Sequence, residues 1–99
     1  MLVAYIPLIV MNQRVHHPNA YLPEIKNVAR GLRARTSILE VLEKEPSDAK
    51  TMIHNTQLHY RVIIYHLRLL KGANIVERKA GKKPYIWMLT GAGQKRLLS

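Results

Sequence analysis

The order of secondary structure elements is decided by residues 35–79, which read RTSILEVLEKEPSDAKTMIHNTQLHYRVIIYHLRLLKGANIVERK. Apolar residues recur through this stretch at spacings of three and four, the pattern of amphipathic helices. Pro46 ends the first helical pattern, because the residue before a proline is disfavoured in a helix. The pattern after it predicts a short helix over residues 49–56 and a stronger helix over residues 60–71.

The ends of these two helices carry residue types that cap helices. Either Ser47 or Asp48 is placed to cap the short helix with a side-chain oxygen. Gly72 follows the last apolar pair of the longer helix, where a left-handed residue is expected, and Asn74 is the alternative for that position.

A β-hairpin is predicted after the longer helix. In residues 74–79, Ile75 and alternatively also Val76 are expected to face inward with the charged residues outward, and residues 85–89 are rich in aromatic and β-branched side chains. Between them, residues 80–84 form a basic turn with glycine and proline. Thr90 then offers a cap for a last helix over residues 91–98.

Toward the amino terminus, residues 23–32 and 38–42 both show helical spacing, and a proline opens the first of these segments. Ser37 and Glu40 are three apart, as a capping box requires, although Thr36 is an equally suitable cap. The pattern leaves open whether these segments form two helices or one kinked helix.

The first 22 residues are predicted to be an arm that precedes a domain over residues 23–99. Residues 2–11 are apolar but too few to span a bilayer, and they lack the flanks of a signal peptide. We expect them to form a strand or extended arm that packs on this chain or on a second copy. Residues 12–22 are polar and are expected to connect the arm to the domain.

Charge is distributed unevenly along this 99-residue chain, whose formal net charge is +10. Residues 1–56 carry seven Lys and Arg against five acids, whereas residues 57–99 carry nine against one. Such a basic, nearly acid-free half indicates a polyanionic partner, with nucleic acid first and an anionic membrane surface second. The absence of cysteine excludes disulfides, thiolate-bound metals and thiol catalysis.

Three short motifs accompany this order of elements. The first helix follows the pattern R-x-x-I-L-x-x-L, in Arg35, Ile38, Leu39 and Leu42. The longer helix approximates V-x-x-H-L-x-x-L, in Ile63, His66, Leu67 and Leu70. Residues 73–78 approximate the G-x-x-V-x-R that opens a wing, and residues 89–93 read L-T-G-A-G.

On these motifs the chain resembles the ArsR-type winged-helix regulators, including small archaeal and archaeal-virus proteins. The resemblance implies a mainly α fold with a small β-hairpin, a winged helix-turn-helix, whose second helix enters the DNA major groove. It implies a sequence-specific, double-stranded DNA-binding transcriptional regulator. The metal sensor of that family uses a cysteine-containing box, which this chain lacks.

The outward face of the helix over residues 60–71 is the predicted reading surface. Arg61 is expected to read bases and Arg68 to meet phosphate. Ile64 either touches a thymine methyl or belongs to the core, and Tyr65 either meets phosphate or is partly buried. His66 is expected to be a structural histidine of the interior. The predicted contacts on or just before this helix are His59, Tyr60, Arg61, Ile64, Tyr65 and Arg68. His59 is equally placed to make a backbone contact at the helix start.

Further DNA contacts are expected from cations outside that helix. The hairpin supplies backbone contacts that give affinity rather than sequence choice, from Arg78, Lys79, Lys82 and Lys83. Lys50 and Gln57 flank the short helix and are weaker candidates for phosphate contact.

No catalytic, metal or cofactor site is predicted, because the acids are scattered and no nucleophile or phosphate-loop pattern occurs. We expect a cytoplasmic, nucleoid-associated homodimer, joined through the arm and the first helix, with no membrane role. A protein-interaction module and a non-specific chromatin- or RNA-binding protein are the alternatives. The sequence does not give the operator, the effector or the direction of regulation.

Overall fold

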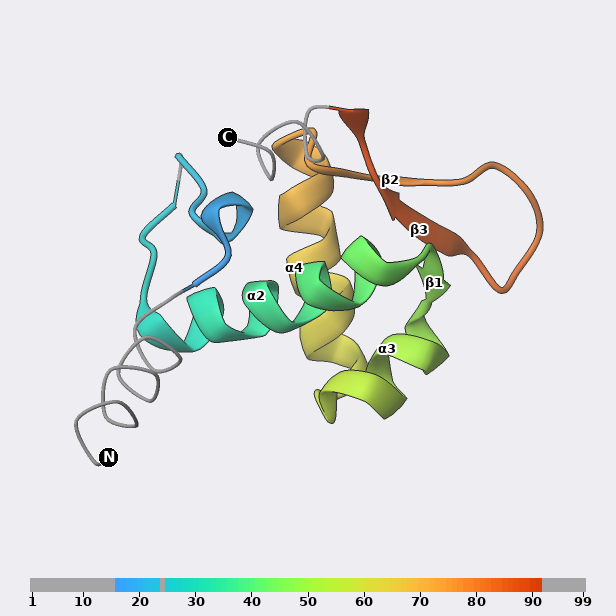
Figure 1. Ribbon diagram of the computed structural model, residues 1–99, viewed down its shortest axis with the longest axis horizontal. Coiled ribbons are helices and arrows are strands. Elements are labelled where there is room, and N and C mark those ends of the chain that lie inside the picture. Colours follow the sequence, from blue (N-terminus) through green and yellow to red (C-terminus); the bar gives the residue numbers. More distant parts are fainter. Residues whose placement is uncertain (1–15, 24, 92–99) are drawn as a thin grey trace, which may run out of the picture.

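The structure is a computed structural model that describes residues 16–23 and 25–91 (Figure 1). Its described part is mainly helical with a small antiparallel sheet, which confirms the predicted balance of helix and strand. The elements in chain order are η1 (Pro18–Ala20), α2 (Ala29–Lys44), β1 (Ser47–Asp48), α3 (Ala49–Thr56), α4 (Tyr60–Gly72), β2 (Val76–Arg78) and β3 (Ile86–Leu89).

The predicted hairpin is confirmed, and a third strand extends it. Strands β2 and β3 pair antiparallel, with Val76 opposite Leu89 and Arg78 opposite Trp87. The two-residue strand β1 pairs with the other edge of β3, which gives the sheet order β1-β3-β2. In Figure 1 the loop between β2 and β3 projects away from the helices. The strand β1 ties the start of α3 to the hairpin, so helices and hairpin hold a fixed relation.

One apolar core joins the three helices to the sheet. The helix α2 crosses α4 in Figure 1, and α3 packs against both. Trp87 from β3 is buried in this core, as predicted. The side chains that are completely enclosed in it include Ile38, Leu39, Met52, Ile63, Leu67 and Leu70. Burial of these six side chains supplies a large part of the folding free energy.

The helix predicted to begin at residue 23 begins instead at Ala29. The reason lies in Asn27, whose side chain replaces the hydrogen bonds that a helical turn would make. Its Oδ1 accepts from the Leu22 backbone N–H at 2.9 Å, and its Nδ2 donates to the Leu22 and Ile25 carbonyls. Asparagine competes with helix formation through such local bonds.

Residues 29–44 form one continuous helix, which settles the choice between one helix and two. The predicted capping box is therefore wrong, because Ser37 and Glu40 lie inside α2, as does Thr36. The Thr36 hydroxyl has a different role, since its oxygen accepts from the His17 backbone N–H at 3.0 Å.

The described end of the predicted connecting segment packs into the domain. Ala20 and Leu22 are buried in the common core, and the His17 imidazole caps η1 by accepting from the Asn19 backbone N–H. The other ring nitrogen of His17 pairs with Glu43 of α2. Residues 17–22 therefore pack against α2. The domain boundary at residue 22 stays a prediction.

The caps of α3 and α4 are partly as predicted. The Asp48 carboxylate caps α3 by accepting from the Thr51 backbone N–H at 2.8 Å, and this bond lowers the pKa of Asp48. Gly72 is the last residue of α4, so its predicted left-handed role is wrong, and Asn74 takes that role with a φ of 62°. A helix C-terminus needs one such residue, and asparagine tolerates it.

Two predicted segments lie outside the described residues. They are the apolar arm before residue 16 and the last helix beyond Gly91. Thr90, proposed as the cap of that helix, is buried, and its hydroxyl donates to the Asn74 carbonyl at 2.7 Å. It therefore holds the end of β3 against the turn that follows α4.

Candidate nucleic-acid interface

Helix α4 has one buried face and one exposed face. The buried face packs on α2 and α3 through Ile63, His66, Leu67 and Leu70. On the opposite side, Arg61 and Arg68 are both exposed, and their spacing of seven places them on one stripe. Tyr65 lies on the same side and exposes 60% of its surface. The predicted stripe is thus open to solvent along two turns of helix.

The buried face of α4 is anchored by a charged side chain from α2. Arg35 is only 1% exposed, and its Nε donates to the Ala20 carbonyl at 2.6 Å. Its two terminal nitrogens reach Asn27 Oδ1 at 3.0 Å and His66 Nδ1 at 3.3 Å. Burial lowers the pKa of His66, with a smaller contribution from the Arg35 charge, so the imidazole stays neutral and accepts this bond. His66 is the structural histidine that the sequence predicted.

A basic groove separates α4 from the hairpin. This hairpin groove has a volume of about 620 Å³. Its cations are Lys50, Arg68, Lys71, Arg78 and Lys83. The only acid among its lining residues is Asp48, whose carboxylate is engaged as the cap of α3. Five cations around one engaged carboxylate produce a positive potential that attracts a polyanion.

Aromatic surface accompanies these cations in the hairpin groove. Arg78 stacks over the Tyr85 ring, with its guanidinium carbon 4.1 Å from the ring centroid. Tyr60, which is 53% exposed, and Ile64 line the α4 side of the groove. Ile64 is half buried and packs against the core, which supports its core role, and its contact with a thymine methyl stays a prediction. The Arg78–Tyr85 contact holds one cation in place at the mouth of the groove.

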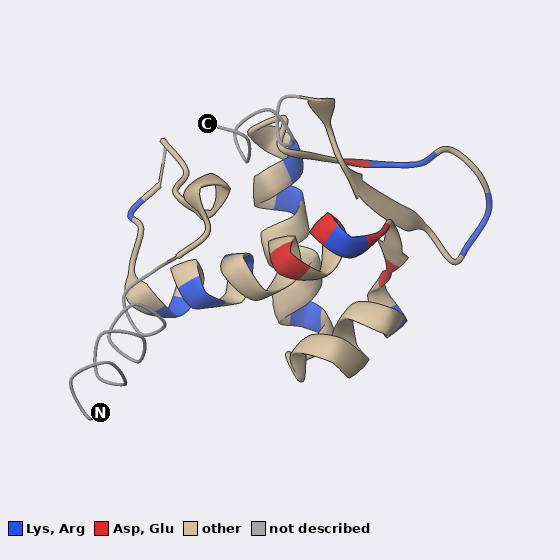
Figure 2. Cartoon of the chain, in the orientation of Figure 1, with Lys and Arg blue, Asp and Glu red and all other residues tan. Residues whose placement is uncertain are grey.

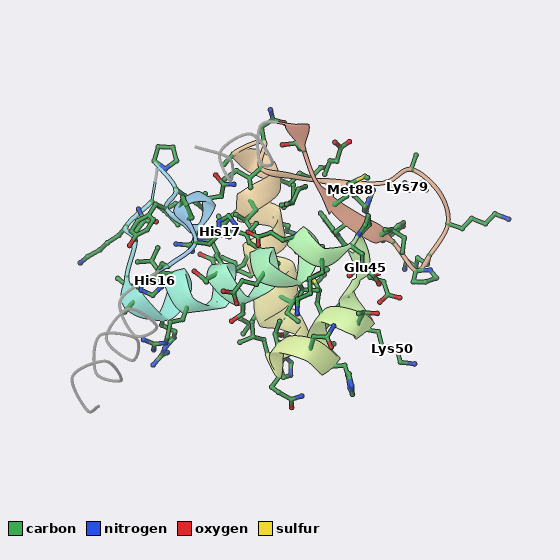
Figure 3. The ribbon with its side chains drawn as sticks, in the orientation of Figure 1. His16, His17, Glu45, Lys50, Lys79 and Met88 are labelled. Atoms are coloured by element: carbon green, nitrogen blue, oxygen red, sulfur yellow. The ribbon has the colours of Figure 1, made fainter. Side chains whose placement is uncertain are left out.

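Two cations of the hairpin loop, Lys79 and Lys82, do not line the groove, whereas Lys83 does. Figure 2 shows basic residues along the projecting loop, and Figure 3 places Lys79 there and Lys50 on α3. Lys79, Lys82 and Lys83 are all exposed. They extend the positively charged surface from the groove along the loop.

Two further predicted residues have local structural roles. His59 caps α4, with its Nδ1 accepting from the Arg61 backbone N–H at 3.1 Å, which confirms the backbone alternative. Gln57 adopts a left-handed φ of 62° at the end of α3, and its side chain donates to the His54 carbonyl at 2.8 Å. Both residues are exposed, so these roles shape the turn between α3 and α4 while leaving their outer surface accessible.

Sequence reasoning missed three basic residues of this region. Lys71 lines the hairpin groove, and Arg30 and Arg33 line a second groove between α2 and α4. The spacing of Lys71, three residues after Arg68, could have identified it. Arg30 and Arg33 could not be placed beside α4, because the packing of α2 against α4 joins residues far apart in the sequence.

The described residues contain neither a membrane-spanning helix nor a cluster of metal-ligating side chains. In residues 16–23 and 25–91, no helix has the length and apolar character needed to cross a membrane. Within the same residues, no three His, Asp or Glu side chains gather in a way that could hold a metal ion. In comparisons with known proteins, no family model matches the chain, and no curated protein is similar enough to count as a match.

Proposed function

We propose that the protein is a sequence-specific, double-stranded DNA-binding regulator of the winged helix-turn-helix class. The observation that carries the proposal is the exposed stripe of α4, with Arg61 and Arg68, beside a groove and hairpin rich in cations. A major groove about 12 Å wide admits one α-helix, and α4 is an α-helix of 13 residues. The order of α3, α4 and a hairpin supports the resemblance to ArsR-type regulators.

Each element has a separate task in this proposal. The amino-terminal turn of α4 presents Arg61 to base edges, where its fork matches the O6 and N7 atoms of guanine. Arg68 and the hairpin lysines meet phosphates, which supply affinity without sequence information. A homodimer would present two such helices to two half-sites.

The test is fluorescence anisotropy of the protein on duplexes enriched by selection and on random duplexes, over a salt series. We expect a steep fall of affinity with salt and a preference of order 10³ or more for the selected duplexes. Lys82→Gln with Lys83→Gln should flatten the slope of log affinity against log salt by about two units.

The matched control is Lys26→Gln with Lys44→Gln, which removes the same charge from exposed positions outside the interface. Its slope should stay close to that of the wild-type protein. A steep slope without sequence preference would replace the proposal with a non-specific coating protein. Absence of binding near physiological salt would replace it with a protein-interaction module.

A further inference from the structure

A second groove lies on the opposite side of α4 from the hairpin, between the amino-terminal halves of α2 and α4. This α2–α4 groove has a volume of about 600 Å³. Its walls include the apolar side chains Ala34, Leu58 and Val62 together with the ring of Tyr65. Val62 and Tyr65 are 37% and 60% exposed, so apolar surface on α4 faces solvent here. The size and apolar walls are those of small-molecule sites.

The charged groups of the α2–α4 groove are all positive. Arg30, Arg33 and Arg61 are exposed and line it, and none of its lining residues is acidic. Behind its floor lies Arg35, whose three hydrogen-bond partners among the described residues are neutral. A buried guanidinium without a carboxylate adds positive potential to the site. An anion is therefore the complementary charge.

His66 adds a neutral donor to the same groove. Because a guanidinium only donates, the Arg35 contact requires His66 Nδ1 to accept, and the ring proton must then reside on Nε2. Nε2 has no hydrogen-bond partner in the described structure and is not enclosed, and His66 lines the groove. The lining of the groove thus includes three arginines and one imidazole whose proton position is defined.

We propose that the α2–α4 groove binds a small organic carboxylate with an aromatic body. The arginines on α2 hold the carboxylate through paired N–H···O bonds, the strongest form of this contact. The aromatic body lies against Val62 and Tyr65, where it buries apolar surface. A phosphate of DNA would use the arginines but leave the apolar wall unused. The apolar segment at residues 2–11 would use the wall but has no acidic side chain for the arginines.

Occupancy of the groove also regulates DNA binding, and this part rests on the proposed function. Arg61 lines the groove and is the proposed base-reading residue, and Tyr65 belongs to the same exposed stripe. A carboxylate held by the arginines on α2 places negative charge beside Arg61, which draws Arg61 away from a base edge, and beside the DNA backbone. The ligand therefore acts as an effector that weakens DNA binding.

The first experiment measures binding without DNA. Full-length ¹⁵N-labelled protein is titrated with 2-naphthoate, and with 2-naphthamide as the uncharged analogue, and amide shifts are followed. We expect saturable shifts for naphthoate that centre on Arg30, Arg33, Val62 and Tyr65, and at least tenfold weaker binding for the amide. Equal affinity for the two probes, or shifts elsewhere, would overturn the proposal.

Variants test whether naphthoate binds in the α2–α4 groove or is attracted only by the positive charge of the protein. Arg30→Gln with Arg33→Gln should weaken naphthoate binding about tenfold, whereas Lys26→Gln with Lys44→Gln removes equal charge and should leave it unchanged. Val62→Ser should weaken naphthoate binding severalfold by removing apolar wall. Equal losses in the two double variants would show nonspecific ion attraction and would contradict the proposal.

The second experiment adds naphthoate to the protein on duplex DNA. We expect weaker DNA binding by the wild-type protein and little response from Arg30→Gln with Arg33→Gln. Naphthoate binding without a DNA effect would retain the site but overturn the regulatory step. If the protein bound no DNA at all, the proposed function would be wrong. The naphthoate titration would still test the proposed carboxylate site, because it is done without DNA. DNA binding lost in the arginine variant, with no naphthoate binding by the wild type, would assign the groove to DNA.

Discussion

Arginine side chains lie on both sides of α4, buried on the inner side and exposed on the outer side. On the inner face, Arg35 of α2 is held by neutral partners, and His66 accepts from it. On the outer face, Arg61 and Arg68 are exposed, and no salt bridge in the described residues includes them. Arg35 connects α2 to α4 and to the segment before α2 through hydrogen bonds. Arg61 and Arg68 are accessible to a polyanion.

The difference shows that charge alone does not mark a binding residue in a basic protein. A buried guanidinium must have its hydrogen bonds satisfied inside the fold, because desolvation without partners is costly. An exposed guanidinium costs the fold little and contributes little to stability. Substitutions on the inner face should therefore change stability, and substitutions on the outer face should change only binding.

The largest expected effect follows from Arg35→Ala. The substitution leaves the Ala20 carbonyl without its Arg35 donor, removes one of the two donors to Asn27 Oδ1 and opens a void beside His66. We expect a loss of about 3 kcal/mol in the free energy of unfolding, measured by urea denaturation. Arg68→Ala on the outer face is the control and should stay within about 0.5 kcal/mol of wild type. Similar losses in both would abolish the contrast between the faces.

Arg61→Ala tests the outer face, with binding as the readout. We expect a loss of about 2 kcal/mol in discrimination between selected and random duplexes, because a base-reading fork is removed. Thermal unfolding should be unchanged, since the Arg61 side chain is exposed. Anisotropy on both duplexes measures the discrimination. An equal loss on the two duplexes would reassign Arg61 to phosphate contact.

The sequence predicted the outer face better than the inner one. Helical spacing placed Arg61 and Arg68 on one stripe, and local patterns located the hairpin and its lysines. These features depend on residues close together in the chain. The short strand β1 was not predicted, because its pairing with Trp87 and Ile86 joins residues far apart in sequence.

The role of Arg35 could not be deduced from its position in a motif. Its burial depends on Ala20 and Asn27, which lie in segments expected to be a connecting loop and a helix. Asn27 bonds across a turn that no local pattern signalled, and the same bonds moved the start of α2 to Ala29. The second groove escaped notice because it depends on how α2 packs against α4, which no local pattern predicts.

Two glycine substitutions, one beside Arg35 and one in open space, should change the free energy of unfolding by about 1 kcal/mol or less. A Cβ at Gly31 would lie 3.0 Å from Arg35 Nη1, which its hydrogen bonds hold in place, so Gly31→Ala should destabilise by about 1 kcal/mol despite better helix propensity. A Cβ at Gly72 meets nothing within 4 Å, so Gly72→Ala should stabilise by about 0.5 kcal/mol. Urea denaturation of both variants measures these values. Stabilisation by Gly31→Ala would show that Arg35 is free to move.

The smallest expected effect is a change in the pH dependence of stability on replacing His66. Burial, and then the nearby Arg35 charge, lowers the pKa of His66 in the folded protein below its ordinary value of 6.5. As pH falls below 6.5, the unfolded chain gains a proton at His66 before the folded protein does, so the folded protein loses stability. This loss ends once the pH has passed the lowered pKa. His66→Asn keeps an acceptor for Arg35 but has no proton to gain, so its stability should fall less between pH 7 and pH 5. Urea denaturation across that range measures both slopes. If stability fell equally with pH in the two proteins, burial and Arg35 would not keep His66 neutral. The assignment of the ring proton to Nε2 would then lose its support.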